Sequence, residues 1–556
     1  MTETSPQSSA FEVDIERVEQ ALTDDAVRLR LTRSLDVDIT PLAAFTILSG
    51  RTDDADSSPD HQFLLESAAK ADSSDPGGVY TTSSAPPDRA RFSFIGYDPL
   101  ARISITDGRA TFTPLAAHPI GDRYDLTELE EGSSMLTHLR EMFPDTVDIG
   151  WEASRRHRLD GGLVGFVAYE AVHDLWLDGA PVERPDSLVP DASFVVNTKT
   201  IAFDHQDDTI TLVMTPYIRP GADLDRVLER AESEVSFIEE RLSQSATPVT
   251  GPFEIAERMD GPRDDYEAAV EEVRDRIAEG EVYQTVISRS SELTGQFDPF
   301  ELYRALQQTS PSPYMYHLEF DDFAVIGASP ETLVTVANDG DRRRVVANPI
   351  AGTAGRGGLP TNDAPDPVED RRLAGELLAD PKERAEHTML VDLARNDLRR
   401  VCRGGSVEVT EFMAVRKYSH VQHIESEVIG ELAQDADVLD ALRSLFPAGT
   451  LTGAPKHRSM ELINELEPDA RGVYGGGVGY LSWNGEADLA IVIRTATIRS
   501  GTPDRLTIRA GAGIVAASDP AREFEETESK LDGLRAAIEL ASGEDTSVTE
   551  VSTHDD

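Results

Sequence analysis

Segments in which apolar residues recur at every second position occur along the chain between segments with the spacing of a helix. Several segments of the first half alternate apolar and polar residues, which is typical of half-buried strands. These segments are Arg91–Tyr97, Gly161–Tyr169, Ser193–Phe203 and Thr209–Thr215. Helical spacing predicts a short helix around Asp14–Leu31 and an amphipathic helix over Ala222–Leu242. The first half therefore mixes strands with helices.

The second half repeats this mixture. The spacing of Val270, Val273 and Ile277 predicts a helix that begins near Asp265. Three strands are expected near the end of the chain, with an Asn-Gly hairpin turn at residues 484–485 between the first two. They are Gly472–Trp483, Leu489–Ile498 and Leu506–Ile514. Helices interspersed with antiparallel strands indicate an α+β protein.

Composition shifts divide the chain into five predicted parts. The small, polar stretch Ser243–Pro252 is typical of a loop and places a linker at 243–262. It separates an N-terminal half, 36–242, from a C-terminal half, 263–540. The ends are an acidic N-terminal segment, 1–35, and a polar acidic tail, 541–556, which we expect to be disordered.

The charge is extreme. The 556 residues carry a formal charge of −50, and only six of the 52 basic residues are lysine. This acidic, lysine-poor composition resembles haloarchaeal proteins, which work in salt-accumulating cytoplasm. Repulsion among the carboxylates disfavours binding to nucleic acid or to an anionic membrane, and salt would screen it.

A single cysteine, Cys402, excludes an intrachain disulfide framework and fits a reducing cytoplasm. The N-terminus is polar and acidic, without a signal peptide, and no apolar run approaches transmembrane length. We therefore expect a cytoplasmic protein.

Two acidic pairs carry the first candidate chemistry. Glu523, Glu526 and Lys530 share one face of a predicted helix, and Glu383 and Glu386 repeat the three-residue spacing upstream. Each pair alone is more simply explained as a solvated helix face. Together they could face each other across one Mg²⁺, which takes few protein carboxylates and fills its sphere with water and substrate oxygens.

A glycine-rich strand end precedes the second acidic helix. Gly511 and Gly513 allow backbone N–H groups to approach a ligand closely. Asp519 can cap the following helix, and Pro520 suits its first position. The arrangement predicts a site for an anionic molecule beside a hard cation.

With further motifs, these segments resemble the chorismate-utilising enzyme family, and within it the branch that forms anthranilate. The motifs occur in family order across residues 263–535. They are Gly280–Gln284, Gly327–Glu331, Pro349–Thr353, Ser419–His423, Phe446–Lys456, Tyr474–Tyr480, Ile493–Thr495 and Gly511–Lys530. The resemblance implies large antiparallel sheets packed as a sandwich with flanking helices, and two intertwined halves.

The resemblance also implies the ligands and their residues. Chorismate would be the substrate, and Mg²⁺ would bind Glu386 and Glu526 directly, with Glu383 and Glu523 acting through water. Lys530 would support these carboxylates or the ring carboxylate. The remaining substrate-binding residues implied are Tyr474 and Arg494 for the enolpyruvyl carboxylate, Gly511, Ala512 and Gly513 for the ring carboxylate, and Gly352 and Thr450 in the pocket wall.

Two further residues match proton-transfer groups of the family. Glu331 would protonate the departing hydroxyl, and His423 resembles the histidine needed when a ring proton and pyruvate leave. A structural role for His423 in a hydrogen-bonded strand is the alternative. Which group takes the ring proton stays open.

Gln284 and Ala351 discriminate between the family's reactions. Isochorismate synthases carry a water-activating lysine at the position of Gln284, and glutamine cannot act as a general base. Aminodeoxychorismate synthases often carry a nucleophilic lysine at the position of Ala351. With both lysines absent, the resemblance implies that chorismate and ammonia give anthranilate and pyruvate, the first committed step of tryptophan biosynthesis.

A regulatory element is implied in the first half. Leu64–Ser67 resembles the family's tryptophan-binding element, and Ser312–Tyr316 resembles its partner segment. The inhibitor-binding residues would be Glu66, Ser67, Pro313, Tyr314 and Met315. We therefore expect feedback inhibition by tryptophan.

Ammonia must come from elsewhere, because Cys402 lacks the setting of a glutaminase nucleophile. We expect a separate glutamine amidotransferase subunit. Aminodeoxychorismate formation is the leading alternative, followed by isochorismate formation and by a non-catalytic regulator that binds tryptophan or chorismate.

Overall fold

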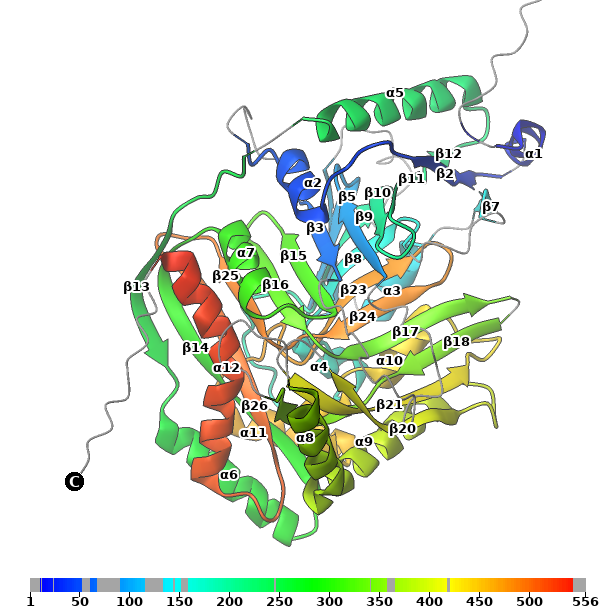
Figure 1. Cartoon of the computed structure of the whole chain (residues 1–556). Coiled ribbons are helices and arrows are strands. Elements are labelled where there is room, and N and C mark those ends of the chain that lie inside the picture. The colour runs from blue at the N-terminus through cyan, green and yellow to red at the C-terminus, as the bar shows by residue number, and fades with distance from the viewer. Residues whose placement is uncertain are drawn as a thin grey trace, which may run out of the picture.

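Two large antiparallel sheets form the framework of this computed structural model (Figure 1). The structure describes residues 11, 13–23, 25–52, 61–67, 91–115, 134–143, 146–151, 159–244, 247–340, 342–357, 366–417 and 421–543. The predicted tail therefore lies outside the described residues from 544 onward, as does the start of the N-terminal segment.

The first sheet contains strands from both halves of the chain. Its order is β13 (Phe253–Asp260), β14 (Gln284–Phe297), β26 (Asp504–Ile514), β25 (Thr495–Arg499), β16 (Phe323–Ser329), β15 (Tyr314–Glu319), β3 (Phe63–Glu66), β4 (Phe92–Gly96), β10 (Lys199–Asp204), β11 (Thr209–Met214) and β2 (Leu31–Ser34). The short β22 (Gly453–Ala454) also pairs with β14. The N-terminal strands join the C-terminal strands where β3 pairs with β15.

The second sheet is mixed in the same way. Its order is β19 (Ile350–Gly355), β21 (Val421–Glu431), β18 (Arg342–Ala347), β17 (Thr332–Asp339), β24 (Ala487–Ile491), β23 (Gly477–Ser482), β8 (Gly162–Val167), β9 (Ala192–Asn197), β5 (Ala101–Thr106) and β6 (Arg109–Pro114), with β20 (Glu408–Lys417) beside β21. A small third sheet joins β12 (Tyr217–Ile218), β1 (Val27–Leu29) and β7 (Val147–Ile149).

Aromatic side chains fill the space between the two large sheets. One core cluster joins strands β3, β4, β10, β15 and β16 of the first sheet to β8, β9, β23 and β24 of the second. Phe94 meets Tyr480 edge-on at 5.8 Å, and Phe166 meets Phe323 in the same way at 5.8 Å. Such geometry is favoured by the aromatic quadrupole. The sandwich expected from the sequence is confirmed.

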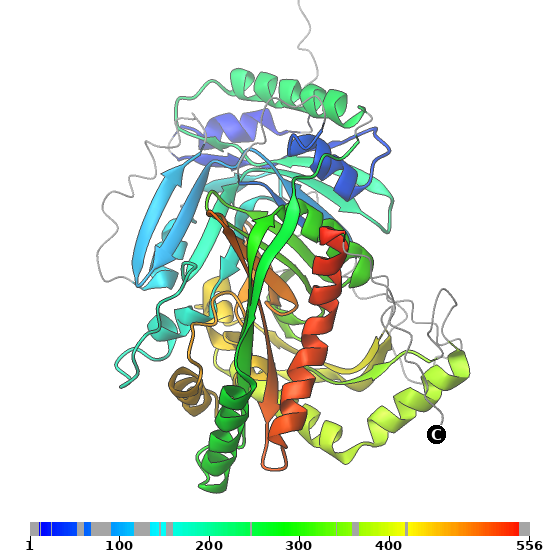
Figure 2. The ribbon, with the colours of Figure 1, turned by 90° about the vertical axis from the view of Figure 1, so that its left-hand side faces the viewer.

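Helices cover the outer faces of the sheets. They are α1 (Ile15–Ala21), α2 (Pro41–Leu48), α3 (Met135–Glu141), α4 (Val172–Leu175), α5 (Leu224–Leu242), α6 (Arg263–Ala278), α7 (Pro299–Thr309), α8 (Pro367–Ala379), α9 (Pro381–Arg399), α10 (Val438–Leu445), α11 (Lys456–Leu466) and α12 (Pro520–Ser542). The 3-10 turns are η4 (Tyr169–Ala171) and η5 (Gly449–Leu451). Figure 2 shows α12 lying along the first sheet, where it packs against α6, α7 and β26. Among the described helices, none combines the length and apolarity needed to cross a membrane.

Three sequence predictions differ from the observed elements. The first helix ends at Ala21, and residues 27–34 form β1 and β2 instead. Ser193–Phe203 is two strands, β9 and β10, which belong to different sheets. The predicted linker at 243–262 contains β13. This strand pairs with β14 in antiparallel register, with Phe253 opposite Phe297. Propensity and periodicity report only the local preference of a segment. The boundaries of these elements differ because they depend on pairing between distant strands.

The predicted strand Leu489–Ile498 is also divided. Its first part is β24 in the second sheet, and its last part is β25 in the first sheet. Between them, Arg494 adopts a left-handed backbone with φ of 50°. This backbone conformation is rare for residues other than glycine. It lets the chain change sheets within a few residues.

Candidate functional site

Two helices present the acidic pairs toward a common region. Glu383 and Glu386 lie one turn apart on α9, whose N-cap Asp380 accepts from the N–H of Lys382 and Glu383. Glu523 and Glu526 lie one turn apart on α12, and its N-cap Asp519 accepts from the Arg522 N–H. Each cap satisfies backbone N–H groups that the helix leaves free, which fixes where the acidic turn begins.

Electrostatic coupling shows that the two pairs converge. Burial raises the pKa of Glu383, Glu386 and Glu523, and the negative charge of Glu526 raises each pKa further. The Lys382 ammonium on α9 lowers the pKa of all three, including that of Glu523 on the other helix. The acidic residues of the two helices therefore form one electrostatic cluster.

Lys530 ties this cluster to the glycine-rich strand. Its Nζ lies 2.8 Å from Glu526 Oε1 and donates to the Gly511 carbonyl at 2.9 Å. The Lys530 and Glu526 side chains are half-exposed, at 49% and 45%. The ammonium is therefore positioned to offset carboxylate repulsion and to orient Glu526.

The donor set suits a hard cation. Oxygen ligands and a shared negative charge are what Mg²⁺ prefers, and it needs only one or two protein carboxylates. In the part of the chain that the structure describes, no three acidic, histidine or cysteine side chains are close enough to enclose a metal by themselves. Glu386 and Glu526 would thus be joined by water or substrate oxygens.

Gln284 borders the acidic region through a contact with Glu386. It is buried at the start of β14, and its Nε2 donates to Glu386 Oε1 at 3.3 Å. A Cβ on Gly513 would overlap the Gln284 amide nitrogen and would lie 3.6 Å from Glu386 Oε1. The glycine therefore leaves room for the amide and carboxylate to meet.

The main chain of Gly511 and Gly513 faces the open side of β26. Strand β25 pairs with β26 only as far as Ile508, so one edge beyond that residue is free of strand pairing. The Gly511 carbonyl already accepts from Lys530 on this side. Main-chain groups alternate sides along an antiparallel strand, so Gly513 shares this side.

Ala512 differs from its two glycine neighbours. Its side chain is completely buried in a small cluster with Tyr266, Val270 and Ile287. Its main chain faces β14 because of the same alternation. A substrate contact at Ala512 stays a prediction, and the period of two along the strand favours main-chain contacts at Gly511 and Gly513.

Tyr474 borders this edge, and Arg494 lies near His423. Tyr474 is buried, and a Cβ on Gly511 would lie 2.9 Å from its hydroxyl oxygen. Burial raises the pKa of Tyr474 to about 12, so the hydroxyl stays protonated. Arg494 lies where the chain changes sheets, and its positive charge acts on His423. Tyr474 is thus near the glycine strand, and Arg494 is near His423 of the second sheet.

His423 and Gly352 meet across neighbouring strands of the second sheet. His423 Nδ1 lies 3.1 Å from the Gly352 carbonyl oxygen. Gly352 has φ of 66°, which favours glycine, and a Cβ there would lie 2.9 Å from Glu383 Oε2, the end of a flexible side chain. Burial lowers the pKa of His423 to about 4, and the Arg494 charge lowers it further. The imidazole is therefore neutral at pH 7.

Glu331 has the opposite shift. It is 7% exposed between β16 and β17, and burial raises its pKa to about 8. Thr450 on η5, the Ile350 main chain and the Lys530 charge partly offset this rise, while the Glu425 charge adds to it. A carboxyl that stays protonated at pH 7 can donate a proton.

The sequence did not reveal a buried ion network behind Tyr474. Glu467 accepts from Arg471 at 2.6 Å, from Arg509 at 3.1 Å and from the Ser288 N–H at 2.8 Å. Arg471 also donates to the Leu451 carbonyl at 2.7 Å and lies over the Tyr474 ring at 5.7 Å. In the sequence, only the four-residue spacing of Glu467 and Arg471 could have indicated this ion pair.

Lys456, which belongs to a family-like motif, lies in another buried ion pair. Its Nζ donates to Asp397 Oδ2 at 2.6 Å, and both side chains are 7% exposed. This pair joins α11 to α9 and so has a structural role. The Ser419–His423 motif is described from Val421 onward, and Ser419 and His420 lie outside the described residues.

The two segments of the predicted inhibitor site lie side by side. Glu66 of β3 pairs with Met315 of β15, and Ser67 Oγ donates to the Pro313 carbonyl at 3.1 Å. Glu66 Oε2 accepts from Tyr303 at 2.7 Å and from Gln307 at 2.8 Å. Burial raises the pKa of Glu66, and these hydrogen bonds oppose the shift.

The other members of the inhibitor set differ in exposure. Met315 is buried, and the half-buried Tyr314 has its hydroxyl 2.8 Å from Thr332 Oγ1 and 3.1 Å from Asp488 Oδ1. All the residues predicted for tryptophan therefore gather around the β3–β15 junction, although Met315 has little surface left for a ligand.

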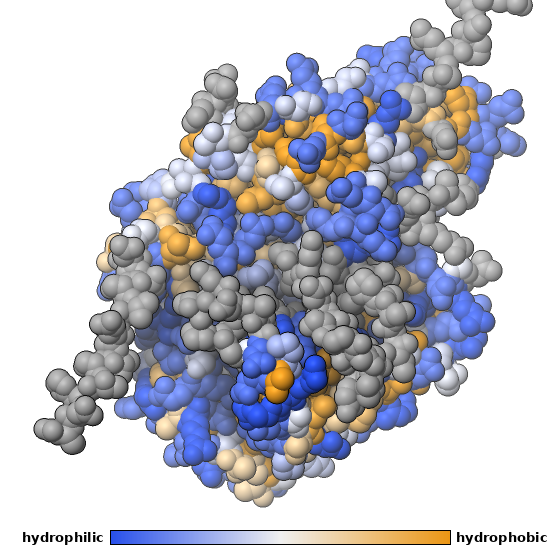
Figure 3. Space-filling view, viewed as in Figure 1, coloured by the Kyte–Doolittle hydropathy of each residue, from blue (hydrophilic) through white to orange (hydrophobic). Residues whose placement is uncertain are grey.

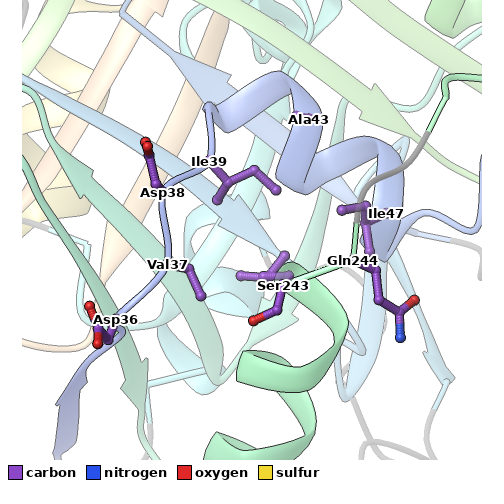
Figure 4. A pocket seen from close by; sticks show the side chains of 9 residues that line it. Asp36, Val37, Asp38, Ile39, Ala43, Ile47, Ser243 and Gln244 are labelled. Carbon is purple, nitrogen blue, oxygen red and sulfur yellow. The ribbon is translucent and has the colours of Figure 1, made fainter.

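An open cavity lies apart from the acidic cluster and from the predicted inhibitor site. Its volume is about 500 Å³, and it lies between α2 and the end of α5 (Figure 4). Figure 3 shows apolar surface on this N-terminal layer. The lining is Asp36, Val37, Asp38, Ile39, Ala43, Ile47, Leu242, Ser243 and Gln244. Among the described residues, this lining contains two carboxylates but no lysine, arginine or histidine.

Comparisons with known proteins agree with this geometry. The family described as chorismate binding enzyme matches residues 78–536. Anthranilate synthase component 1 2 of Haloarcula marismortui is 51% identical over 543 residues, covering 97% of this chain and 98% of the relative. Anthranilate synthase component 1 of Haloferax volcanii is 51% identical over 517 residues, covering 93% and 94%.

A solved structure gives the same result. The crystal structure of anthranilate synthase component I from Streptococcus pneumoniae aligns with a TM-score of 0.64 and 33% identity, covering 83% of this chain and 95% of that one. The family resemblance and the fold expected from the sequence are confirmed. On the motifs, the sandwich and these similarities, the chain belongs to the chorismate-binding enzymes.

Proposed function

We propose that the chain is the large subunit of an anthranilate synthase. It converts chorismate and ammonia into anthranilate and pyruvate, the first committed step of tryptophan biosynthesis, in the cytoplasm. The nearly full-length similarity to anthranilate synthase components supports this proposal.

The observation that carries the choice of reaction is the contact between Gln284 and Glu386. An amide at this position cannot take a proton from water, which disfavours isochorismate formation. Ala351 likewise supplies no nucleophile to the ring. The nucleophile must therefore be free ammonia.

Mg²⁺ is the proposed cofactor. Glu386 and Glu526 would hold it, and Glu383 and Glu523 would act through water. When bound, it supplies Lewis-acid stabilisation of the charge that develops on the ring carboxylate. The raised pKa values of Glu383, Glu386 and Glu523 support this role, because a cation relieves their mutual repulsion.

The proposed protein groups divide the remaining work. The Arg494 guanidinium and the Tyr474 hydroxyl bind the enolpyruvyl carboxylate, since a guanidinium fork matches a carboxylate. The N–H groups of Gly511 and Gly513 face the ring carboxylate. Thr450 forms part of the pocket wall beside Glu331.

Proton transfers follow from the protonation states. Ammonia forms the C–N bond beside the carboxylate-bearing ring carbon, the ring double bonds shift, and the distant C–O bond breaks. Protonated Glu331 gives its proton to the departing hydroxyl, which leaves as water. Neutral His423 then assists the elimination in which a ring proton and pyruvate are lost, giving the aromatic ring.

Two partners complete the proposal. A glutamine amidotransferase subunit supplies ammonia in the cell, because Cys402 is buried and its thiol pKa is raised to about 11 by burial. Tryptophan inhibits by binding at the β3–β15 junction, where Glu66 would pair with its amino group.

Product identification tests the proposal. Purified protein in concentrated KCl is incubated with chorismate, Mg²⁺ and ammonium, and the products are separated by chromatography. Anthranilate and pyruvate in equal amounts are expected. Accumulation of aminodeoxychorismate or isochorismate would assign a different family reaction, and unchanged chorismate would contradict an enzymatic role.

A further inference from the structure

A small cavity adjoins Glu331 on the inner side of α9. Its volume is about 40 Å³. Leu390, Leu393 and Ala394 of α9 form one wall, and η5 with its preceding residues forms another. Glu331 and Thr450 line it, so it borders groups already placed in the proposed site.

Two buried polar atoms in this wall, Asn348 Oδ1 and Thr450 Oγ1, have no hydrogen-bond partner in the described part of the chain. Asn348 is 2% exposed, and its Nδ2 donates to the Ser426 carbonyl at 3.4 Å, while its Oδ1 is buried without a hydrogen bond. Buried acceptors are nearly always satisfied, so an orphan oxygen indicates a missing donor. Asp397, also in the lining, is already paired with Lys456.

Size and polarity restrict the missing donor. A cavity of about 40 Å³ holds roughly one water-sized molecule, since water occupies about 30 Å³ in the liquid. The remaining lining is largely apolar, with Leu445, Ala448 and Ile491 opposite α9. An apolar wall favours a neutral molecule over its charged form.

We propose that this cavity binds the neutral ammonia molecule before it attacks the ring, with Asn348 Oδ1 accepting one N–H. The inference rests on the proposed function, because only an aminating enzyme needs such a site. Asn348 lies three residues before Ala351, so the segment that lacks a nucleophilic side chain also borders the cavity. The water released beside Glu331 is the competing occupant.

Ammonium-dependent kinetics of single variants test the site. Asn348→Leu removes the acceptor, and Ala394→Val fills the cavity without altering Asn348. Loss of one neutral hydrogen bond corresponds to about a fivefold to tenfold change in affinity. We expect the KM for ammonium to rise by this factor in both variants, while the KM for chorismate stays within about twofold. Leu393→Met, which nearly conserves volume, is the matched control.

The outcomes separate this inference from the proposed function. Wild-type protein that forms no anthranilate contradicts the function itself. Active wild type with an unchanged ammonium KM in both variants overturns the ammonia site. A fall in kcat alone overturns it too, and assigns the cavity to the departing water. Thermal unfolding of each variant in the same buffer verifies that the fold is retained, and Ala394→Val decides the matter where Asn348→Leu does not fold.

Discussion

At the scale of single residues, burial shifts the two proposed proton-transfer groups in opposite directions. The pKa of Glu331 rises to about 8 and that of His423 falls to about 4, in each case mainly through burial. At pH 7 the carboxyl is therefore protonated and the imidazole is neutral. Such a reversal is how one site provides an acid and a base at the same pH.

Loss of the acid should be visible in the pH profile. Because Glu331 must be protonated and His423 neutral, wild-type kcat should be constant between about pH 4 and about pH 8 and fall on either side. Glu331→Gln should lower kcat by about 10²–10⁴-fold and abolish this alkaline limb. Glu461→Gln on α11 is the control. A variant that keeps the wild-type profile would remove Glu331 from the mechanism.

The metal assignment is tested on adjacent residues of α12. Glu526→Gln should weaken Mg²⁺ activation by at least about 100-fold, the upper end of the effect known for groups beyond the direct ligands. Glu525 lies next to it but pairs with Arg263 at 2.9 Å, so Glu525→Gln should change little. Titration of activity with Mg²⁺ compares them. Equal activation constants would show that Glu526 is no ligand.

At the scale of elements, function depends on where strands end and change partners. Strand β26 loses one neighbour after Ile508, which frees the edge at Gly511 and Gly513. Arg494 lies where the chain passes from one sheet to the other. Helices α9 and α12 bring their first turns to this edge. The site is thus assembled from element ends, where side chains and main chain are both accessible.

The β3–β15 junction allows a test of inhibition. Ser67 Oγ donates to the Pro313 carbonyl, so Ser67→Phe would separate the two segments and fill the space between them. Inhibition by tryptophan should weaken by at least about tenfold, with little change in the uninhibited rate. Inhibition curves of Ser67→Phe and Ser67→Ala are compared. An unchanged curve for Ser67→Phe would place the inhibitor elsewhere.

The Glu467 network should matter for stability. Glu467→Gln leaves two buried guanidinium groups with less compensating charge, and breaking such a pair costs about 3–5 kcal/mol. Glu465→Gln, near the end of α11 and two residues before Glu467, removes only a half-exposed pair with Arg458 and should cost less than about 1 kcal/mol. Denaturant unfolding measures both, and equal free energies would contradict the network's importance.

These elements show what the sequence could predict. Periodicity located α5 closely, and Glu-x-x-Glu spacing identified the two acidic turns, because both signals are local. Arg494's change of sheet and the pairing of β3 with β15 depend on contacts between distant residues, which periodicity does not report. At Ala512 the family-like motif marks only a segment, whereas strand alternation decides which residues of that segment face the open edge.

At the scale of the whole molecule, repulsion among surface carboxylates opposes folding. The formal charge is −50, and the Debye length falls from about 10 Å at 0.1 M salt to about 3 Å at 1 M. Screening should therefore stabilise the folded chain. The buried pairs of Glu467 and Lys456 are shielded from water, so they should be less sensitive to salt than the surface.

Thermal unfolding across KCl concentrations tests this screening. The Tm should rise by about 5 °C or more between 0.1 and 2 M KCl. Sucrose at matched osmotic strength is the control, because it is uncharged and leaves the Debye length unchanged. A Tm that responds equally to sucrose and KCl, or falls with KCl, would contradict an electrostatic origin.

The strand order of the first sheet also governs how the chain reaches its native state. Leu64 pairs with His317, and β26, beside β14, is completed only at residue 514. During translation, β3 can pair with β4 early, but it leaves the ribosome long before its second partner, β15, exists. Such distant pairing slows folding and leaves an unsatisfied strand edge exposed to other chains. We therefore expect a nascent chain that depends on chaperones until its last strand is synthesised.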